Sequence, residues 1–199
     1  MRATGVRRGR GAGAAVATAA LVGIVAAEVT MAYEAAYPRT EAGTIEVKTL
    51  PTATVMAAEL REGDRNGAFR ELFRYIQDRK VPMTVPVEIE QGTNAAMRFY
   101  LDSARTNSPP ASSDSVAVTS RVARTVISIG LRGSYRKKHF TKAVNRLALW
   151  VAAHPEWTVD GDAYQVFWNS PFVPFFLKRS EVHLPVRKAE GENPGAASP

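Results

Sequence analysis

The chain repeats one pattern of residues in two halves, at a constant offset of 71 positions. In each half a β-rich run leads through a glycine into a stretch with helical spacing. Because the matches share one offset and fall on equivalent elements, they predict the duplication of one supersecondary unit. The matching pairs are Thr54-Val55 with Thr125-Val126, Leu60-Arg61 with Leu131-Arg132, and Phe69 with Phe140.

Each half contains one amphipathic helix. In the first half, apolar residues recur at the spacing of a single helix face, at Phe69, Leu72, Phe73 and Ile76. Asp64 is placed to cap the start of this helix. The second half has an equivalent apolar stripe from 140 to 151, and His154-Pro155 ends it because proline disfavours helix in the residue before it.

Strand-like runs surround both helices, two before and two after each. We therefore expect an α+β domain of duplicated ββαββ units, with a curved antiparallel eight-stranded sheet and two flanking helices. The expected strands are 44–50, 52–60, 85–90, 95–101, 115–120, 124–131, 163–168 and 181–186. The domain is expected to span 44–187, with a linker at 107–115 and a disordered polar tail at 188–199.

The first 43 residues precede this repeat. Four arginines lie among the first ten residues and are followed by the uncharged run 11–27. This order is typical of a secretory signal peptide, and the run is also within reach of an uncleaved membrane anchor plus linker. Either form places the domain on the non-cytoplasmic side, exported or tethered to the membrane.

Composition excludes several kinds of site. The chain has no cysteine, so disulfides, thiolate-bound metals and covalent Cys-x-x-Cys-His haem attachment are ruled out. It also lacks a nucleophile elbow, a glycine-rich phosphate loop and a histidine pair at metal spacing. The carboxylates are scattered, and His183 is expected to point outward from the last strand. We therefore expect no enzyme, no catalytic residue and no metal site.

The net charge of +7 does not by itself indicate nucleic acid. No stripe of lysine and arginine alternates with aromatic residues along one element, so no nucleic-acid partner is expected.

Two segments combine apolar and basic residues. The first helix carries Phe69 and Phe73 beside Arg70 and Arg74, and the loop 172–176 is followed by two cations. An apolar face edged by arginine suits a flat hydrophobic anion, because guanidinium groups pair with carboxylates. Either segment can instead be ordinary packing, of the helix on the sheet or of the loop over the end of the barrel.

Several blocks resemble the SOUL haem-binding protein family, over nearly the whole chain after Thr44. They are Arg74-Tyr75-Ile76, Met83-Thr84-Val85-Pro86-Val87, and a late block with Pro171, Pro174, Lys178-Arg179 and Glu181-Val182. The resemblance implies a distorted eight-stranded barrel with two helices on its flank. It also implies a tetrapyrrole, haem or another porphyrin, bound non-covalently against the first helix. The matching site residues are Phe69, Phe73, Arg74, Met83, Lys178 and Arg179. No histidine precedes His139, so the early iron ligand proposed for some members has no counterpart.

The expected function is therefore non-catalytic binding of haem or a related tetrapyrrole, for buffering, carriage or sensing. Three alternatives remain at this stage. The domain can bind another hydrophobic anionic small molecule, or hydrolyse a small lipophilic substrate with Glu181 or Tyr164. It can also contact another protein through its aromatic loop. The oligomeric state stays open.

Overall fold

The computed structural model describes residues 33–61, 64–92, 95–170 and 172–189. The predicted signal peptide or anchor and most of the predicted tail lie outside these ranges. Within them, no helix is both long and apolar enough to cross a membrane.

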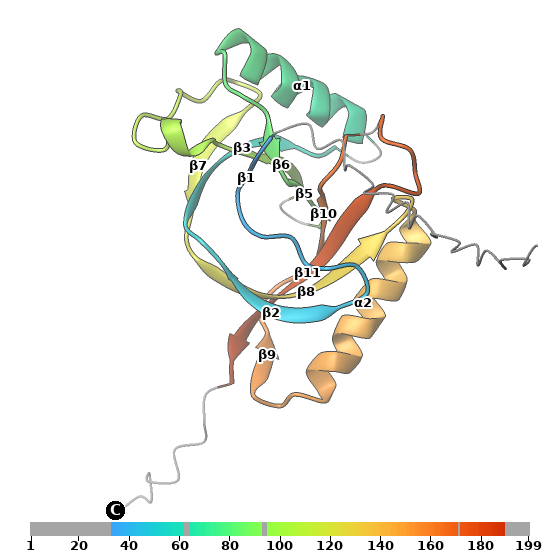
Figure 1. Cartoon of the computed structure of the whole chain (residues 1–199). Coiled ribbons are helices and arrows are strands. Elements are labelled where there is room, and N and C mark those ends of the chain that lie inside the picture. Colours follow the sequence, from blue (N-terminus) through green and yellow to red (C-terminus); the bar gives the residue numbers. More distant parts are fainter. Residues whose placement is uncertain (1–32, 62–63, 93–94, 171, 190–199) are drawn as a thin grey trace, which may run out of the picture. The chain divides into compact units, whose positions relative to one another are not determined.

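The core of the fold is one curled antiparallel sheet with helices on its outer side (Figure 1). Its strand order is β2-β8-β11-β10-β5-β6-β3-β7, and β9 (Trp157–Val159) pairs with the end of β11. The strands are β2 (Ile45–Leu50), β3 (Ala53–Glu59), β5 (Val87–Glu90), β6 (Ala96–Tyr100), β7 (Ala117–Arg121), β8 (Arg124–Arg132), β10 (Tyr164–Phe167) and β11 (Arg179–Lys188). The α+β prediction is confirmed, in the form of a half-barrel.

The strand order is symmetric about its centre. From the adjacent β5 and β10, the order runs outward through β6, β3 and β7 on one side, and through β11, β8 and β2 on the other. Each half therefore contributes its first strand to the edge of the other half, since β2 pairs with β8 and β7 with β3. This exchange ties the two ββαββ units into one sheet.

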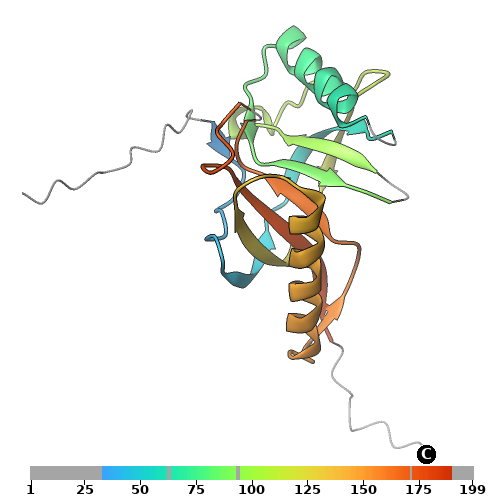
Figure 2. The same cartoon turned by 90° about the vertical axis from the view of Figure 1, so that its right-hand side faces the viewer.

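The two helices cover the outer face of the sheet. Helix α1 (Arg65–Asp78) packs on β3 and β6, and α2 (Lys137–Ala152) packs on β11 and β8 (Figure 2). As predicted, the Asp64 side chain caps α1 by accepting a 2.7 Å hydrogen bond from the backbone N–H of Gly67. Leu72 and Ile76 lie on the buried apolar face of α1, and Leu147 lies on the buried face of α2.

The chain before Thr44 is part of the fold. Strand β1 (Glu34–Ala35) pairs in parallel with β4 (Thr84–Val85), and the residues that follow pack against the inner side of the curl. Gly130 of β8 allows this close approach, because a Cβ atom there would lie 2.2 Å from the carbonyl oxygen of Glu41. Tyr37 and Thr40 are consequently buried.

Four short elements were not predicted from the sequence: β1, β4, β9 and the 3-10 helix η1 (Ser103–Arg105). Each has only two or three residues, which is too few to establish a period.

Candidate ligand site on helix α1 and a buried polar cluster

Two aromatic rings stack on each other at the edge of the buried face of α1. The rings of Phe69 and Phe73 are stacked, with centroids 5.9 Å apart and planes inclined by 12°. Phe69 is anchored edge-on against Phe99 of β6, at 5.6 Å, while Phe73 remains 41% exposed. Because Phe69 is fixed against the core and stacks on Phe73, the partly exposed ring of Phe73 is an ordered apolar surface. We call this stacked pair the aromatic platform.

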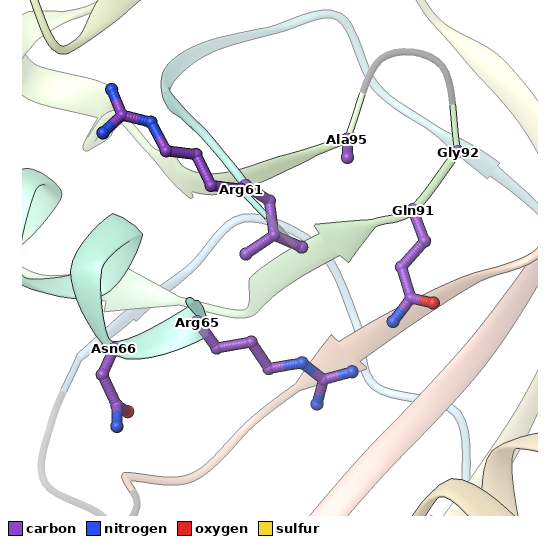
Figure 3. Close-up of a pocket in the computed structure, with 7 residues that line it drawn as sticks. Arg61, Arg65, Asn66, Gln91, Gly92 and Ala95 are labelled. Atoms are coloured by element: carbon purple, nitrogen blue, oxygen red, sulfur yellow. The ribbon is translucent and has the colours of Figure 1, made fainter. Parts of the chain in front are cut away.

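A pocket of about 760 Å³ lies between the start of α1 and the connection from β5 to β6 (Figure 3). Arg65 lines it and precedes Phe69 and Phe73 by one and two helical turns, so the pocket lies at the end of the aromatic platform. The described lining residues are Leu60, Arg61, Arg65, Asn66, Gln91, Gly92 and Ala95. Its volume is in the range of small-molecule sites.

The guanidinium group of Arg65 gives this pocket its positive charge. Figure 3 shows Arg65 and Gln91 extending to the same side, whereas Arg61 points away from them. Nη2 of Arg65 donates a 3.0 Å hydrogen bond to Oε1 of Gln165 on β10, which fixes the arginine at the pocket. Gln165 lies opposite Ile89 of β5, on the sheet face that the helices cover. The described lining residues include no carboxylate, so the pocket is suited to an anionic group.

The six residues predicted for the site divide into two groups. Phe69, Phe73 and Arg74 share α1, with Arg74 exposed, and Met83 packs against the core beneath that helix. Lys178 is the last residue of the loop before β11, and Arg179 is the first residue of β11.

The described contacts of these two cations lie on the α2 side of the fold. Lys178 Nζ is 5.0 Å from the ring centroid of Tyr135, and Arg179 Nη1 donates to the carbonyl of Leu177 at 3.0 Å. The structure brings together the aromatic pair of α1, whereas these two contacts of Lys178 and Arg179 lie beside the start of α2.

Sequence reasoning missed Arg61, Arg65 and Gln165. The helical spacing from Arg65 to Phe69 and Phe73 was a usable signal for Arg65. Gln165 lies 100 residues away along the chain, so no local pattern pointed to it.

A second arrangement lies inside the curl, centred on the fully buried Glu88. Its carboxylate accepts hydrogen bonds from the hydroxyls of Tyr37 (3.1 Å) and Tyr100, from Arg121 (2.8 Å) and from Arg124 (3.0 Å). Burial alone would raise the pKa of Glu88, but Arg124 and Arg121 together bring that pKa below its ordinary value. Glu88 is therefore an ionised, fully paired carboxylate.

Glu181 of β11 is the second buried carboxylate. It accepts hydrogen bonds from the backbone N–H of Thr40 (2.7 Å), Nζ of Lys48 (2.8 Å), Oγ of Ser128 (2.9 Å) and Nε2 of His183 (2.6 Å). Burial opposes ionisation, but His183 and Lys48 outweigh it and lower the pKa of Glu181 to about 2. This carboxylate holds the N-terminal segment inside the sheet.

Tyr164 and His183 connect the two carboxylates. The Tyr164 hydroxyl lies 3.2 Å from Nη2 of Arg124 and 3.1 Å from Nδ1 of His183. Burial lowers the pKa of His183, so the ring is neutral and Nε2–H donates to Glu181. Glu88 and Glu181, which the sequence analysis treated as scattered, thus belong to one buried cluster.

The prediction that His183 points outward was wrong, since its side chain is fully buried. Side chains alternate along β11, and Val182 and Leu184 face α2. Glu181 and His183 occupy the opposite face, which the segment after β1 covers. Both faces of β11 are therefore buried.

The N-terminal segment occupies the inner side of the curl in this structure. The Tyr37 ring packs edge-on against Tyr100 at 5.5 Å and against Trp168 at 5.7 Å. Glu181 and Tyr164, the residues considered for hydrolysis, are 1% and 2% exposed. An external molecule can reach the α1 surface without displacing any part of the fold, but it cannot reach these two groups.

Comparison with known proteins agrees with this fold. The sequence profile described as "SOUL heme-binding protein" matches residues 30–185. No curated protein matches the chain. Among solved structures, the fold is similar to EcmrR in its DNA complex, with a TM-score of 0.56, 12% identity and 73% of this chain covered. It is also similar to the EcmrR C-terminal domain, with a TM-score of 0.52, 14% identity and the same coverage.

These matches span 58% of the first EcmrR chain and 98% of the second. At such low identity they show the fold alone. The family profile is different, because it covers well over half of the sequence. The chain belongs to the SOUL haem-binding protein family.

Proposed function

We propose that this protein binds haem or a related tetrapyrrole non-covalently on the surface of α1, without catalysing a reaction. The observation that carries the proposal is the stacked pair of Phe69 and Phe73 leading to a pocket lined by Arg65. A porphyrin combines a flat apolar ring with anionic propionates, and this surface combines a flat apolar platform with guanidinium groups. Membership of the family supports the same ligand class.

Each group on this surface has a distinct part in binding. Phe73 and Phe69 contact the macrocycle, and Arg65 pairs with a propionate at the pocket end. Arg74, exposed on α1 one residue after Phe73, is the second candidate for a propionate. Lys178 and Arg179 add positive potential from the start of β11.

The residues at this surface fit the organic part of haem better than its iron. Axial ligands in haem proteins are histidine, methionine, cysteine or tyrosine side chains. Among the six predicted residues only Met83 is of this kind, and it packs into the core beneath α1. We therefore expect ring contact and propionate pairing to dominate, so that haem and metal-free protoporphyrin bind with similar affinity.

The alternatives are less well supported. Another hydrophobic anion would use the same surface and would compete with porphyrin for it. Hydrolysis by Glu181 or Tyr164 would require the N-terminal segment to leave, since both side chains are buried.

The test is titration of hemin and metal-free protoporphyrin into the full chain, followed by absorbance. Saturable binding of both ligands, weakened by Phe73→Asp and by Arg65→Glu, is the expected result. Leu149→Asp is the matched control for the first variant, because Leu149 is also an exposed apolar residue of a helix. Absence of saturation, or an equal loss in the control, would remove the proposal and leave the fold assignment intact.

We also propose that the domain acts outside the cytoplasm, exported or tethered through its N-terminus. The support is the order of four arginines followed by an uncharged run in residues 1–27. Fusion of alkaline phosphatase to the C-terminus tests this, because that enzyme needs an oxidising compartment for its disulfides. An inactive but intact fusion would contradict export.

A further inference from the structure

The loop between β10 and β11 turns large apolar side chains toward solvent. Phe172 is 95% exposed and Phe175 is 66% exposed, and Phe176 and Leu177 are also exposed. Exposed apolar groups collected in one short segment mark an interaction surface. The ligand site proposed above does not use these four side chains.

Hydrogen bonds hold this loop in place. The backbone N–H of Leu177 donates to the carbonyl of Pro174 at 2.9 Å, and Arg132 Nε donates to the carbonyl of Phe176 at 3.0 Å. The N–H of Gly133 donates to the carbonyl of Lys178 at 3.0 Å. Because the backbone is already fixed, docking of the aromatic tip costs little ordering entropy.

Cations at the start of α2 belong to the same surface. The hydroxyl of Tyr135 lies 3.2 Å from the carbonyl oxygens of both Asn169 and Arg179, so it ties the base of the loop to the segment that leads into α2. Arg136 and the next two lysines follow at once, and all three are exposed. We call this set the basic aromatic surface: Arg132, Arg136, Lys137, Lys138, Phe172, Phe175, Phe176, Leu177, Lys178 and Arg179.

The charge of the surrounding sequence has one sign. Residues 131–155 contain six lysines and arginines and no aspartate or glutamate. Residues 163–180 contain two basic residues and no acidic residue. Cations at the start of a helix oppose the helix dipole, and the first turn of α2 has no acidic residue to offset them. Helix stability therefore does not explain this clustering, whereas an anionic partner does.

We propose that the basic aromatic surface docks the protein on a bilayer that contains anionic phospholipid. Phe172, Phe175 and Phe176 enter the interfacial region, where aromatic rings are favoured, and the cations contact the headgroups. Each basic side chain close to such a surface strengthens binding about fivefold. A second copy of the chain fits this surface poorly, because a twofold contact would bring the same cations face to face.

The chain contains no cysteine, so a single one can be placed at the tip. The full chain with Phe172→Cys is labelled with an environment-sensitive fluorophore and mixed with two kinds of vesicle. One kind is phosphatidylcholine alone, and the other also contains phosphatidylglycerol. Val122→Cys is the matched control, because Val122 is an exposed apolar residue in the turn between β7 and β8.

A blue shift at position 172 on the anionic vesicles, quenched by brominated acyl chains and absent at position 122, is the expected result. Residues 1–32 stay in the protein, and the label reports on the loop whatever they do. An unchanged emission on anionic vesicles would overturn the proposal. A shift that follows protein concentration without vesicles would also overturn it, in favour of self-association.

Charge reversal is the second arm of the test. The double variant Lys137→Glu and Lys138→Glu is expected to weaken binding of the anionic vesicles at least about tenfold. Added salt is also expected to weaken this binding, because it screens the charges. The pair Arg70→Glu and Lys80→Glu on the α1 side makes the same charge change and is expected to alter binding less than about twofold. Acidic residues favour the start of a helix, so the first pair cannot act by unfolding α2. Equal effects of the two pairs would contradict the proposed surface.

Discussion

Nη2 of Arg65 donates a 3.0 Å hydrogen bond to Oε1 of Gln165, and this contact joins the first turn of α1 to the central strand β10. An arginine side chain has five N–H donors in a fixed planar arrangement. The bond to Gln165 uses one donor and orients the rest at the pocket. Arg65 is therefore a preorganised partner for a ligand carboxylate, next to the aromatic platform on the same helix.

The role of Arg65 predicts a dependence on the ligand's carboxylates. Arg65→Glu is expected to weaken protoporphyrin binding by about tenfold or more, because hydrogen bonds to charged groups contribute about 1.5–3 kcal/mol. The dimethyl ester of protoporphyrin lacks the carboxylate charges. Its affinities for the wild-type protein and for the variant are expected to differ by less than about threefold. The same absorbance titration measures the affinity of each protein, wild type and Arg65→Glu, for each ligand, acid and ester. An equal loss of affinity for the acid and the ester in the variant would rule out propionate pairing.

Phe73 is expected to contribute through its ring. Phe73→Leu keeps an apolar side chain but removes the flat surface, so porphyrin affinity should fall about fivefold. The free energy of unfolding should change by less than about 0.5 kcal/mol, because the ring is partly exposed. Leu149→Ala on α2 is the control and should change neither quantity much. An affinity unchanged by Phe73→Leu would show that the ring does not contact the ligand.

Glu88 is expected to be critical for stability and not for ligand binding. Glu88→Gln leaves Arg121 and Arg124 without their buried anion and should lower the free energy of unfolding by about 3–5 kcal/mol. Urea unfolding monitored by tryptophan fluorescence measures this change. A loss below about 1 kcal/mol would mean that the buried cluster is not a stabilising network.

The buried cluster also predicts how stability depends on pH. The pKa values of Glu88, Glu181 and His183 are all lower in the folded protein than in the unfolded chain. Below the unfolded values the unfolded chain binds more protons, so the free energy of unfolding must fall as pH decreases. The fall begins near pH 6.5 with His183 and steepens below about pH 4.5 with the two glutamates.

His183→Asn isolates the first part of this pH dependence. Asparagine does not titrate, so the slope of the unfolding free energy between about pH 6.5 and 5 should become smaller in the variant. Chemical unfolding at several pH values measures the slope. An unchanged slope would mean that the pKa of His183 is the same in the folded protein and in the unfolded chain.

Much of the fold could be predicted from the sequence because its signals are local. The 71-residue offset gave the duplication, and helical spacing gave α1 and α2. The exchange of β2 and β7 between the halves could not be predicted, because strand partners far apart in the chain leave no local pattern. His183 shows the same limit, since alternation marks two faces of a strand but does not tell which one another segment covers.

Part of the candidate site could also be predicted from local sequence, and part could not. Phe69, Phe73 and Arg65 follow one another at helical spacing, so sequence alone can place them on one surface. Gln165 and the connection from β5 to β6 complete the pocket from other parts of the chain. Only the folded sheet brings them to the start of α1.

The most direct test of ligand binding at α1 is amide NMR of the full chain during titration with metal-free protoporphyrin. Our account predicts that the largest shift changes fall on residues 65–74 and on Gln91 and Gly92, with Tyr37 and His183 little affected. The contradicting result is a set of changes centred on residues 37–44 and 181–183. That pattern would mean that the ligand enters the curl by displacing the N-terminal segment.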